Sequence, residues 1–305
     1  MPAPSLKTWL LLSVVAALLT IGLKSAAYLV TGSVGLFSDA LESVVNLVAA
    51  VTAYLSLIYA ARPADANHTY GHEKIEFFSA GVEGALIVVA GVGAVALAVR
   101  RLFSESPLEE LAAGALLSLA ASVINGVVGL ALIRIGRRHG SIILEADGKH
   151  LISDVWTTVG VVGGLLLVWL TGIQWLDSAA AILVGANIVV LGAGLVRRSF
   201  NGLMDHALDP AEQEAIRAVI RDHTPPGTDF HAVRTRQAGA RRFVDFHLLV
   251  PGAFTVREAH DLGMKVEAAL AGKWPALETT VHIEPIEDEA SWQDNALRGI
   301  EPPGR

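Results

Sequence analysis

The chain has no cysteine and is short of charged side chains. The missing cysteines exclude disulfides, redox motifs and thiolate metal sites, so any bound metal must use histidine, carboxylate, amide or water ligands. Charged residues make up 17% of the 305 residues and hydrophobic residues 52%, above the roughly 45–50% apolar content of soluble domains. The net charge of −7 argues against a nucleic-acid partner, which needs a basic face. A membrane protein is therefore expected.

Long apolar runs occupy the first two thirds of the chain. Six stretches approach the ~20 residues that cross a bilayer, and they lie near residues 8–30, 34–60, 79–101, 108–134, 143–171 and 176–197. No signal-peptide cleavage site follows the first stretch, so we expect it to be retained. An even number of spans places both termini on one side of the bilayer. With the termini inside, most basic residues near span ends face the cytoplasm and only Arg100 and Arg101 do not, so the positive-inside rule predicts cytoplasmic termini.

The composition after residue 205 is that of a soluble domain. Asp209-Pro210 predicts a helix start, and residues 230–238, 241–250 and 279–286 predict strands, with a second helix over 255–270. Val244, Phe246, Leu248 and Val250 alternate, which indicates one buried sheet face. The predicted architecture is an all-α six-helix transmembrane bundle (residues 1–205), a small α+β domain of order α-β-β-α-β (206–288) and a disordered tail (289–305).

Two of the predicted spans carry metal-ligand side chains at helical spacing. Glu42 and Asn46 lie four residues apart on one helix, and His150 and Asp154 on another. Ionisable groups in hydrocarbon are costly unless they face the bundle interior, water or a cation. Four oxygen and nitrogen ligands suit a tetrahedral metal ion, which predicts a transport site. The alternative is that these groups hydrogen-bond to one another and lock the bundle.

Other polar residues interrupt the same apolar stretches. Asp39 and Asp147 lie about one turn from the two pairs and are either accessory charges at the entrance or helix-end polar groups. Glu83 and Asn125 are either helix-to-helix hydrogen-bonding groups or part of the path lining.

The segment between the second and third stretches carries Asp65, His68 and His72. Helix-breaking residues around them predict a short loop at the inner surface. Three ligand-type residues within eight positions predict a surface metal site. Ordinary solvated histidines are the alternative.

The soluble domain carries five further ligand-type residues: His231, His247, His260, His282 and Glu284. Strand alternation places His247, and separately His282 with Glu284, on the sheet face opposite the apolar residues. The residues alone leave open whether the set binds metal or consists of surface histidines.

Lys74 and Asp205 are single charges beside the predicted third and sixth spans. An isolated exposed pair contributes at most about 1 kcal/mol. The alternative is that the two charges, which lie at the junction between the membrane and soluble parts, form a salt bridge that fixes where two subunits meet.

Three runs together resemble the cation diffusion facilitator family: residues 31–46, 63–72 and 146–154, with further similarity over 203–208 and 234–237. The resemblance implies a homodimeric, multi-pass exporter of Zn²⁺ or a similar divalent ion from the cytoplasm, driven by proton antiport, in a bacterial inner membrane. It also implies a metallochaperone-like cytoplasmic domain. By position it assigns the transport site to Glu42, Asn46, His150 and Asp154, the loop site to Asp65, His68 and His72, the regulatory site to His231, His247, His260, His282 and Glu284, and an interface salt bridge to Lys74 and Asp205.

The first pair departs from the family pattern. Zinc exporters of this family usually carry Asp or His followed four residues later by Asp, where this chain has Glu42 and Asn46. A neutral amide removes one anion and one titratable group from the site. Mn²⁺, Fe²⁺ or Co²⁺ are therefore alternatives to Zn²⁺ as the main substrate.

Two other classes of function were weighed. An intramembrane metalloenzyme is disfavoured because His72-Glu73 does not extend to H-E-x-x-H and no nucleophile lies beside a base, so we expect a protein that is not an enzyme. A membrane metal sensor or scaffold would bind the ion without moving it, and only a flux measurement separates it from a carrier.

Overall fold

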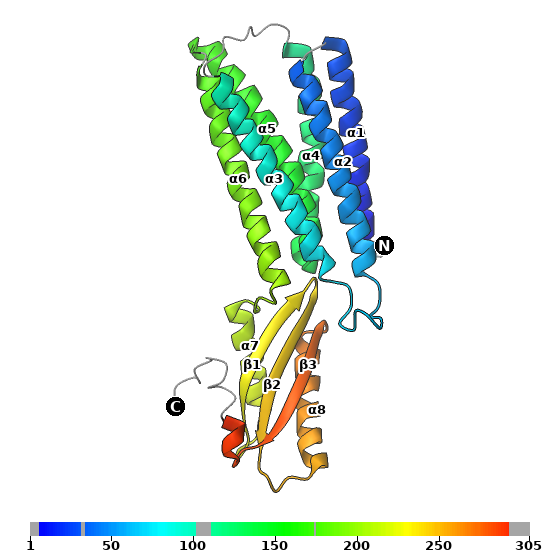
Figure 1. Cartoon of the computed structure of the whole chain (residues 1–305), viewed down its shortest axis with the longest axis vertical. Coiled ribbons are helices and arrows are strands. Elements are labelled where there is room, and N and C mark those ends of the chain that lie inside the picture. Colours follow the sequence, from blue (N-terminus) through cyan, green and yellow to red (C-terminus); the bar gives the residue numbers. More distant parts are fainter. Residues whose placement is uncertain (1–5, 32–33, 102–110, 174, 293–305) are drawn as a thin grey trace. The chain divides into compact units, whose positions relative to one another are not determined.

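The computed structural model describes residues 6–31, 34–101, 111–173 and 175–292, and the chain divides into two compact units, Met1–Leu203 and Met204–Arg305. The first unit contains long helices that lie alongside one another (Figure 1). They are α1 (Leu6–Thr31), α2 (Val34–Ala60), α3 (Ile75–Arg101), α4 (Leu111–His139), α5 (Ile142–Thr171) and α6 (Trp175–Leu203).

This unit is a helical transmembrane domain. Within the described residues, α1, α3, α4 and α6 contain segments long and apolar enough to cross a bilayer. Helix α2 contributes the shorter apolar segment Asn46–Ala60. The first half of α5 is less apolar because it carries Glu145, Asp147, Lys149 and Asp154. Of the six predicted membrane crossings, length and composition thus support four among the described residues.

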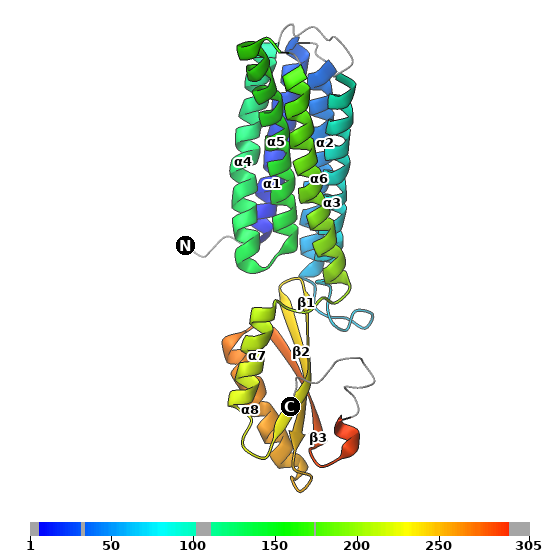
Figure 2. The same cartoon turned by 90° about the vertical axis from the view of Figure 1, so that its left-hand side faces the viewer.

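Helices α3 and α6 pack side by side along their length (Figures 1 and 2). Small residues allow the two backbones to touch. A Cβ atom added at Gly192 would lie 2.9 Å from the Gly84 carbonyl oxygen and 2.9 Å from the Val88 backbone nitrogen. About two helical turns earlier, a Cβ atom added at Gly185 would lie 3.1 Å from the Gly91 carbonyl oxygen. The contact therefore has no room for even one methyl group.

We expect Gly192→Ala to destabilise the transmembrane domain by about 1–3 kcal/mol, because backbone atoms that cannot rotate away oppose the new methyl group. Gly194→Ala is the matched control on the same helix, since nothing lies within 4 Å of its added Cβ. Thermal unfolding of both variants in one detergent measures the difference. Equal unfolding temperatures would contradict the close contact.

Two apolar clusters hold the bundle together. The first joins residues of α1, α2, α4 and α5, including Leu10, Leu57, Leu132 and Leu144. The second joins α3, α5 and α6, including Phe77, Ile142 and Ile188. Helix α5 contributes to both clusters, so its polar residues lie at the centre of the bundle.

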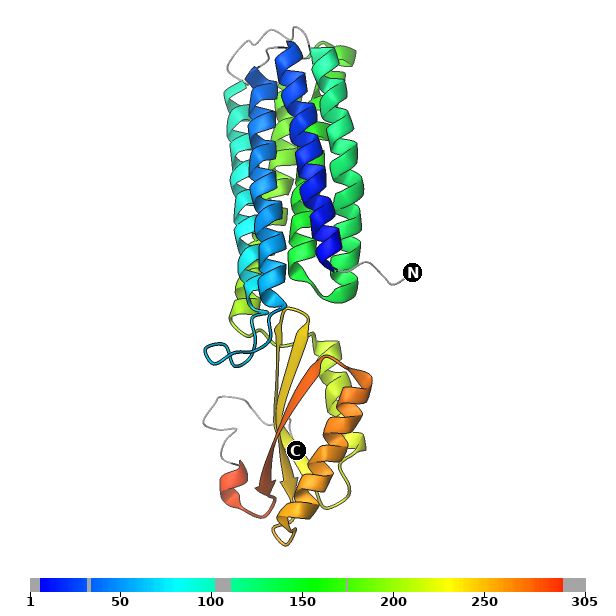
Figure 3. The ribbon, with the colours of Figure 1, turned by 90° about the vertical axis from the view of Figure 1, so that its right-hand side faces the viewer.

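The second unit is the small α+β domain, and the predicted α-β-β-α-β order is confirmed. Its elements are α7 (Pro210–Asp222), β1 (Asp229–Ala238), β2 (Arg241–Val250), α8 (Val256–Lys273) and β3 (Leu277–Pro285). The sheet order is β1-β2-β3, with β1 antiparallel and β3 parallel to the central β2. Both helices cover one sheet face (Figure 3). Between them and the sheet lies a core that includes the predicted inward residues Val244, Phe246, Leu248 and Val250.

Side-chain caps begin both helices of this domain. Asp209 accepts a hydrogen bond from the Ala211 N–H, with Pro210 in the first turn of α7, as the sequence predicts. Thr255 and Glu258 form a reciprocal capping box at α8. The Thr255 N–H donates to Glu258 at 2.7 Å, and this bond holds the pKa of the Glu258 carboxyl below its usual value.

The predicted disordered tail needs a correction at its beginning. Residues 289–292 are helical and are held by side-chain hydrogen bonds. Ser291 Oγ donates to the Pro285 carbonyl at 2.8 Å, and Trp292 Nε1 donates to the Ile286 carbonyl at 3.0 Å. Polar composition alone suggested disorder, whereas these two donors have fixed acceptors. The remaining tail, residues 293–305, lies outside the described part of the chain.

Candidate metal sites

A cluster of buried polar side chains lies between α2, α4 and α5. The Asn46 Nδ2 group donates to the Asp154 carboxylate, and Asn46 Oδ1 lies 2.6 Å from His150 Nε2. Asn125 of α4 donates to the same Asp154 oxygen at 3.3 Å. All four side chains are buried, with relative exposures of 1–4%. The cluster is therefore a buried group of polar side chains within an otherwise apolar bundle.

The hydrogen bonds of this cluster leave one ligand atom open. Asn46 Oδ1 is only an acceptor, so the His150 Nε2 that contacts it carries the proton. His150 Nδ1 then has a lone pair, and it is buried without a hydrogen-bond partner among the described residues. The cluster thus combines a neutral imidazole, a carboxylate and two carboxamides, which are ligand types suited to a divalent cation.

Three of the four residues predicted for the transport site are thus in contact. The predicted spans 34–60 and 143–171 run in opposite directions, so their edges place Glu42 nearer the outer side and His150 nearer the inner side of the bilayer. In the structure α2 and α5 nevertheless pack so that Asn46 reaches both His150 and Asp154. The side chains of Glu42 and Asp39 lie outside the described residues, although both positions belong to α2. Asn125 was not among the predicted ligands. The feature of the sequence that pointed to it was a single carboxamide side chain in an otherwise apolar stretch.

Asp147 lies one turn before His150 on α5 but interacts with different neighbours. It is 1% exposed and interacts electrostatically with Glu83 of α3. Glu83 is also 1% exposed, and among the described residues neither carboxylate has a hydrogen-bond partner. Within the described part of the chain, Glu83 therefore makes no helix-to-helix hydrogen bond.

A buried carboxylate without partners destabilises a fold, so Glu83→Met is expected to raise the stability of the transmembrane domain by roughly 1–3 kcal/mol. Val82→Met, at the neighbouring half-exposed position, is the control and should change stability little. Thermal unfolding in detergent checks both. A lower unfolding temperature for Glu83→Met would show that the carboxylate is held by a stabilising interaction.

The loop between α2 and α3 brings Asp65, His68 and His72 together. Asp65 Oδ1 lies 3.2 Å from His68 Nδ1, and Asp65 Oδ2 lies 3.2 Å from His72 Nε2. Candidate ligand atoms of the three residues lie within 4.8 Å of one another. Gly71, at φ of 90°, makes the turn that returns His72 toward Asp65.

Backbone hydrogen bonds preorganise this loop. Asp65 accepts from the backbone N–H of His68 at 2.7 Å and of Asn67 at 2.9 Å. The His68 bond is the main reason that the pKa of Asp65 is lowered from its ordinary value. Its carboxylate is therefore ionised at every physiological pH. His72 is fixed on the other side, where its ring packs edge-on against Tyr59.

The soluble domain gathers four of its five predicted ligands on one sheet face. His231, His247 and His282 are direct cross-strand partners on β1, β2 and β3. Glu284 Oε2 lies 3.0 Å from His231 Nε2 and 3.1 Å from His247 Nδ1, and Oε1 lies 3.4 Å from His282 Nε2. One carboxylate between three imidazoles is an arrangement that fits a divalent metal ion.

His260 does not join this cluster within the single chain, and its role as a metal ligand stays a prediction. It belongs to α8, and α8 covers the opposite sheet face through Ala259, Leu262 and Val266. Strand alternation directs the other four side chains away from that face. Helical spacing did not indicate which sheet face α8 would cover.

Two local features support the position of His231. A β-bulge follows it, and Ala232 in that bulge has φ of 50°, a conformation that disfavours a residue with a Cβ. Trp292 places its ring 5.5 Å from the His231 ring. The tryptophan comes from the segment predicted to be disordered, so sequence reasoning missed it.

Asp205 forms an ion pair with Arg236 at 3.5 Å within the soluble domain. The predicted pairing of Asp205 with Lys74 at a subunit interface is not tested by a single chain and stays a prediction.

The apolar helices and the clusters of histidine, carboxylate and amide ligands define a class: a multi-pass membrane protein that binds divalent metal ions. Comparison with known families and proteins specifies the class further. The family described as the cation efflux transmembrane domain matches residues 10–204, and the family described as the cation efflux protein cytoplasmic domain matches residues 208–286. The chain therefore belongs to the cation diffusion facilitator, or cation efflux, family, whose members are transporters and not enzymes.

Relatives match along nearly the whole chain. The uncharacterized transporter sll1263 of Synechocystis sp. is 47% identical over 293 residues, covering 96% of this chain and 94% of that protein. The cation-efflux pump FieF of Shewanella oneidensis is 30% identical over 289 residues, covering 92% and 94%. Among solved structures, the zinc form of CzrB is 43% identical and covers 27% of this chain and 92% of its own, with a TM-score of 0.26. The chain is thus a metal cation efflux transporter.

Proposed function

We propose that this protein exports Zn²⁺ from the cytoplasm in exchange for protons, through a site made by Glu42, Asn46, His150 and Asp154. In this proposal all six helices cross the bilayer and both termini are cytoplasmic. The observation that carries it is the contact of Asn46 with both His150 and Asp154 in a buried cluster, where His150 Nδ1 has no hydrogen-bond partner within the described part of the chain. An apolar bundle that only needed to be locked would not leave this lone pair unused.

Proton coupling follows from the chemistry of the same atoms. A metal ion and a proton compete for the lone pair of His150 and for the carboxylate of Asp154. His150 would bind either the proton or the metal ion through this lone pair, so it would release a proton when metal arrives from inside and take one up as metal leaves. Alternation between inward and outward access around this site would then exchange one species for the other.

Asn46 makes a second group of ions, Mn²⁺, Fe²⁺ and Co²⁺, alternative substrates in this proposal. Its amide oxygen is a neutral, hard ligand, and it replaces an anionic ligand at the position that contacts both His150 and Asp154. Mn²⁺ and Fe²⁺ prefer oxygen-rich, less anionic sites to sites that contain two carboxylates and a histidine. Co²⁺ is the remaining candidate.

The soluble domain and the loop are proposed as regulatory metal sites in a homodimer. Residues 206–288 would form the cytoplasmic metal-binding and dimerisation domain, with metal at His231, His247, His282 and Glu284, and His260 contributing to a site that a single chain does not complete. Asp65, His68 and His72 would hold a further ion at the inner surface. Lys74 and Asp205 would pair at the subunit interface, and the membrane would be the bacterial inner membrane.

Purified protein in proteoliposomes tests the transport proposal. Metal entry is followed with a trapped metal-sensitive dye and proton movement with a trapped pH dye, for Zn²⁺, Mn²⁺, Fe²⁺, Co²⁺ and Cd²⁺ in turn. We expect Zn²⁺ flux that is accelerated by an opposing proton gradient. If Mn²⁺ or Fe²⁺ moved faster than Zn²⁺, that ion would be the main substrate instead of Zn²⁺. Metal binding without flux would support the sensor or scaffold alternative.

A further inference from the structure

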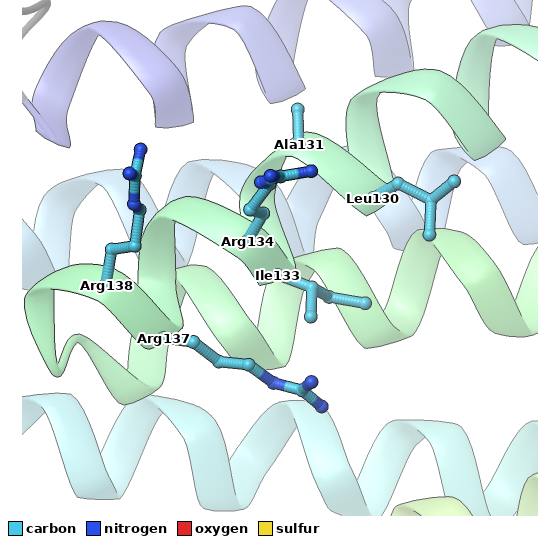
Figure 4. Close-up of a pocket in the computed structure, with 6 residues that line it drawn as sticks. All are labelled: Leu130, Ala131, Ile133, Arg134, Arg137 and Arg138. Atoms are coloured by element: carbon cyan, nitrogen blue, oxygen red, sulfur yellow. The ribbon is translucent and has the colours of Figure 1, made fainter.

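The C-terminal end of α4 carries a basic pocket that the transport sites do not use. Leu130, Ala131 and Ile133 form its apolar side, and Arg134, Arg137 and Arg138 line the rest (Figure 4). In the close-up, the Arg134 and Arg138 side chains lie on one side of α4 and Arg137 points to the other side (Figure 4). The pocket therefore joins an apolar wall to two neighbouring guanidinium groups.

Two of these arginines have no anionic partner among the residues that the structure describes. Arg137 lies 3.6 Å from Glu145, which also pairs with Lys149 and Arg198. Arg134 and Arg138 form no ion pair or hydrogen bond with any residue that the structure describes, and both are exposed. Guanidinium groups bind phosphate oxygens through paired N–H donors. This end of α4 thus presents two guanidinium groups that an anion can bind.

The residues before the arginines show what the rest of the ligand would be. Val123, Val127 and Leu130 lie on the same stripe of α4 as Arg134 and Arg138, at spacings of three and four residues. These three apolar side chains are 60–67% exposed in the chain. In a bilayer an exposed apolar stripe contacts acyl chains, and basic residues beyond its end contact headgroups.

We propose that Arg134 and Arg138 hold the phosphate of an anionic phospholipid, with one acyl chain lying along Val123, Val127 and Leu130. The ligand class follows from the continuity of the stripe, since a free phosphate ion would use the arginines and leave the apolar residues without a role. The site lies on α4, the helix that also supplies Asn125 to the intramembrane cluster. It does not depend on which metal ion is transported.

Lipid binding to the full-length protein in detergent tests this site. Native mass spectrometry gives the dissociation constant for dioleoyl phosphatidylglycerol and for dioleoyl phosphatidylcholine. We expect the wild type to bind phosphatidylglycerol more tightly, and R134Q/R138Q to bind it at least about tenfold more weakly, since each basic residue near a membrane surface contributes about 1 kcal/mol toward anionic lipid. The control R257Q/K265Q also removes two exposed positive charges that form no ion pair among the described residues, but it removes them from α8 of the α+β domain, and it should bind like the wild type.

Two further arms make the outcome decisive. R134K/R138K keeps both charges but loses the paired N–H donors, so it should bind phosphatidylglycerol more weakly than the wild type and more tightly than R134Q/R138Q. Wild-type affinity in R134K/R138K would overturn the assignment of the phosphate to the two guanidinium groups. Inorganic phosphate at millimolar concentration should not displace the lipid. Displacement by phosphate, or unchanged lipid binding by R134Q/R138Q, would also overturn it.

Discussion

His150→Gln is expected to reduce metal transport in proteoliposomes by at least roughly 100-fold, beyond the 10–100-fold loss typical of groups that only support a ligand. Glutamine is close in length and keeps a hydrogen bond to Asn46, but it removes the imidazole lone pair that has no hydrogen-bond partner among the described residues. It also removes the basic nitrogen for which a proton and a metal ion would compete. Metal-driven proton flux should therefore disappear together with metal flux.

His139→Gln is the matched control for this experiment. His139 lies exposed in the last turn of α4, where its Nδ1 contacts the Ile135 carbonyl at 3.0 Å. Its replacement should leave transport within about twofold of the wild type, as for surface substitutions away from a site. Unchanged transport by His150→Gln, with normal unfolding of the variant, would remove His150 from the transport site.

Glu284→Gln should abolish tight metal binding by the soluble domain, because Glu284 is the one carboxylate placed between His231, His247 and His282. The amide retains the shape of the side chain but loses the negative charge that offsets the metal ion. We expect the affinity of this site to fall by about 100-fold or more. Metal content of the purified full-length protein, measured after equilibration at fixed free Zn²⁺, gives the result.

Glu278→Gln provides the comparison for Glu284→Gln on the same strand. Glu278 is half-exposed on β3 and pairs with Arg241 rather than with any histidine. Its variant should lose no bound metal. If both variants lost metal equally, a general effect on β3 would explain the result, and Glu284 would not be identified as a ligand.

Local patterns in the sequence were sufficient to predict most of the architecture. The alternation from Val244 to Val250 placed β2 in the core with the correct inward residues, and Asp209-Pro210 placed the start of α7. Hydropathy placed the long helices because runs of apolar residues have few other uses. These features depend on neighbouring residues, so they can be read without knowing the tertiary structure.

Features that depend on contacts between distant residues were less predictable. Asn46 and His150 are separated by 104 positions, and their contact depends on the relative depth of α2 and α5, which hydropathy fixes only to within several residues. The metal-binding role of His260 stays a prediction, because the position of α8 on the sheet determines which ligands it can join within one chain. Trp292 was missed because its hydrogen bond to the Ile286 carbonyl forms only when the sheet is complete.

The carboxamide of Asn46 has two chemically unlike ends, one facing His150 and the other facing Asp154. A cation that approaches the Asp154 side meets the NH₂ end, which has no electrons to give, so the amide must rotate to present its oxygen. An aspartate at this position would need no such rotation, since both of its ends are oxygens. If metal binds at this position, residue 46 is therefore expected to change its side-chain orientation between the empty and the loaded protein, and a ¹⁵N label on its side chain would report that change.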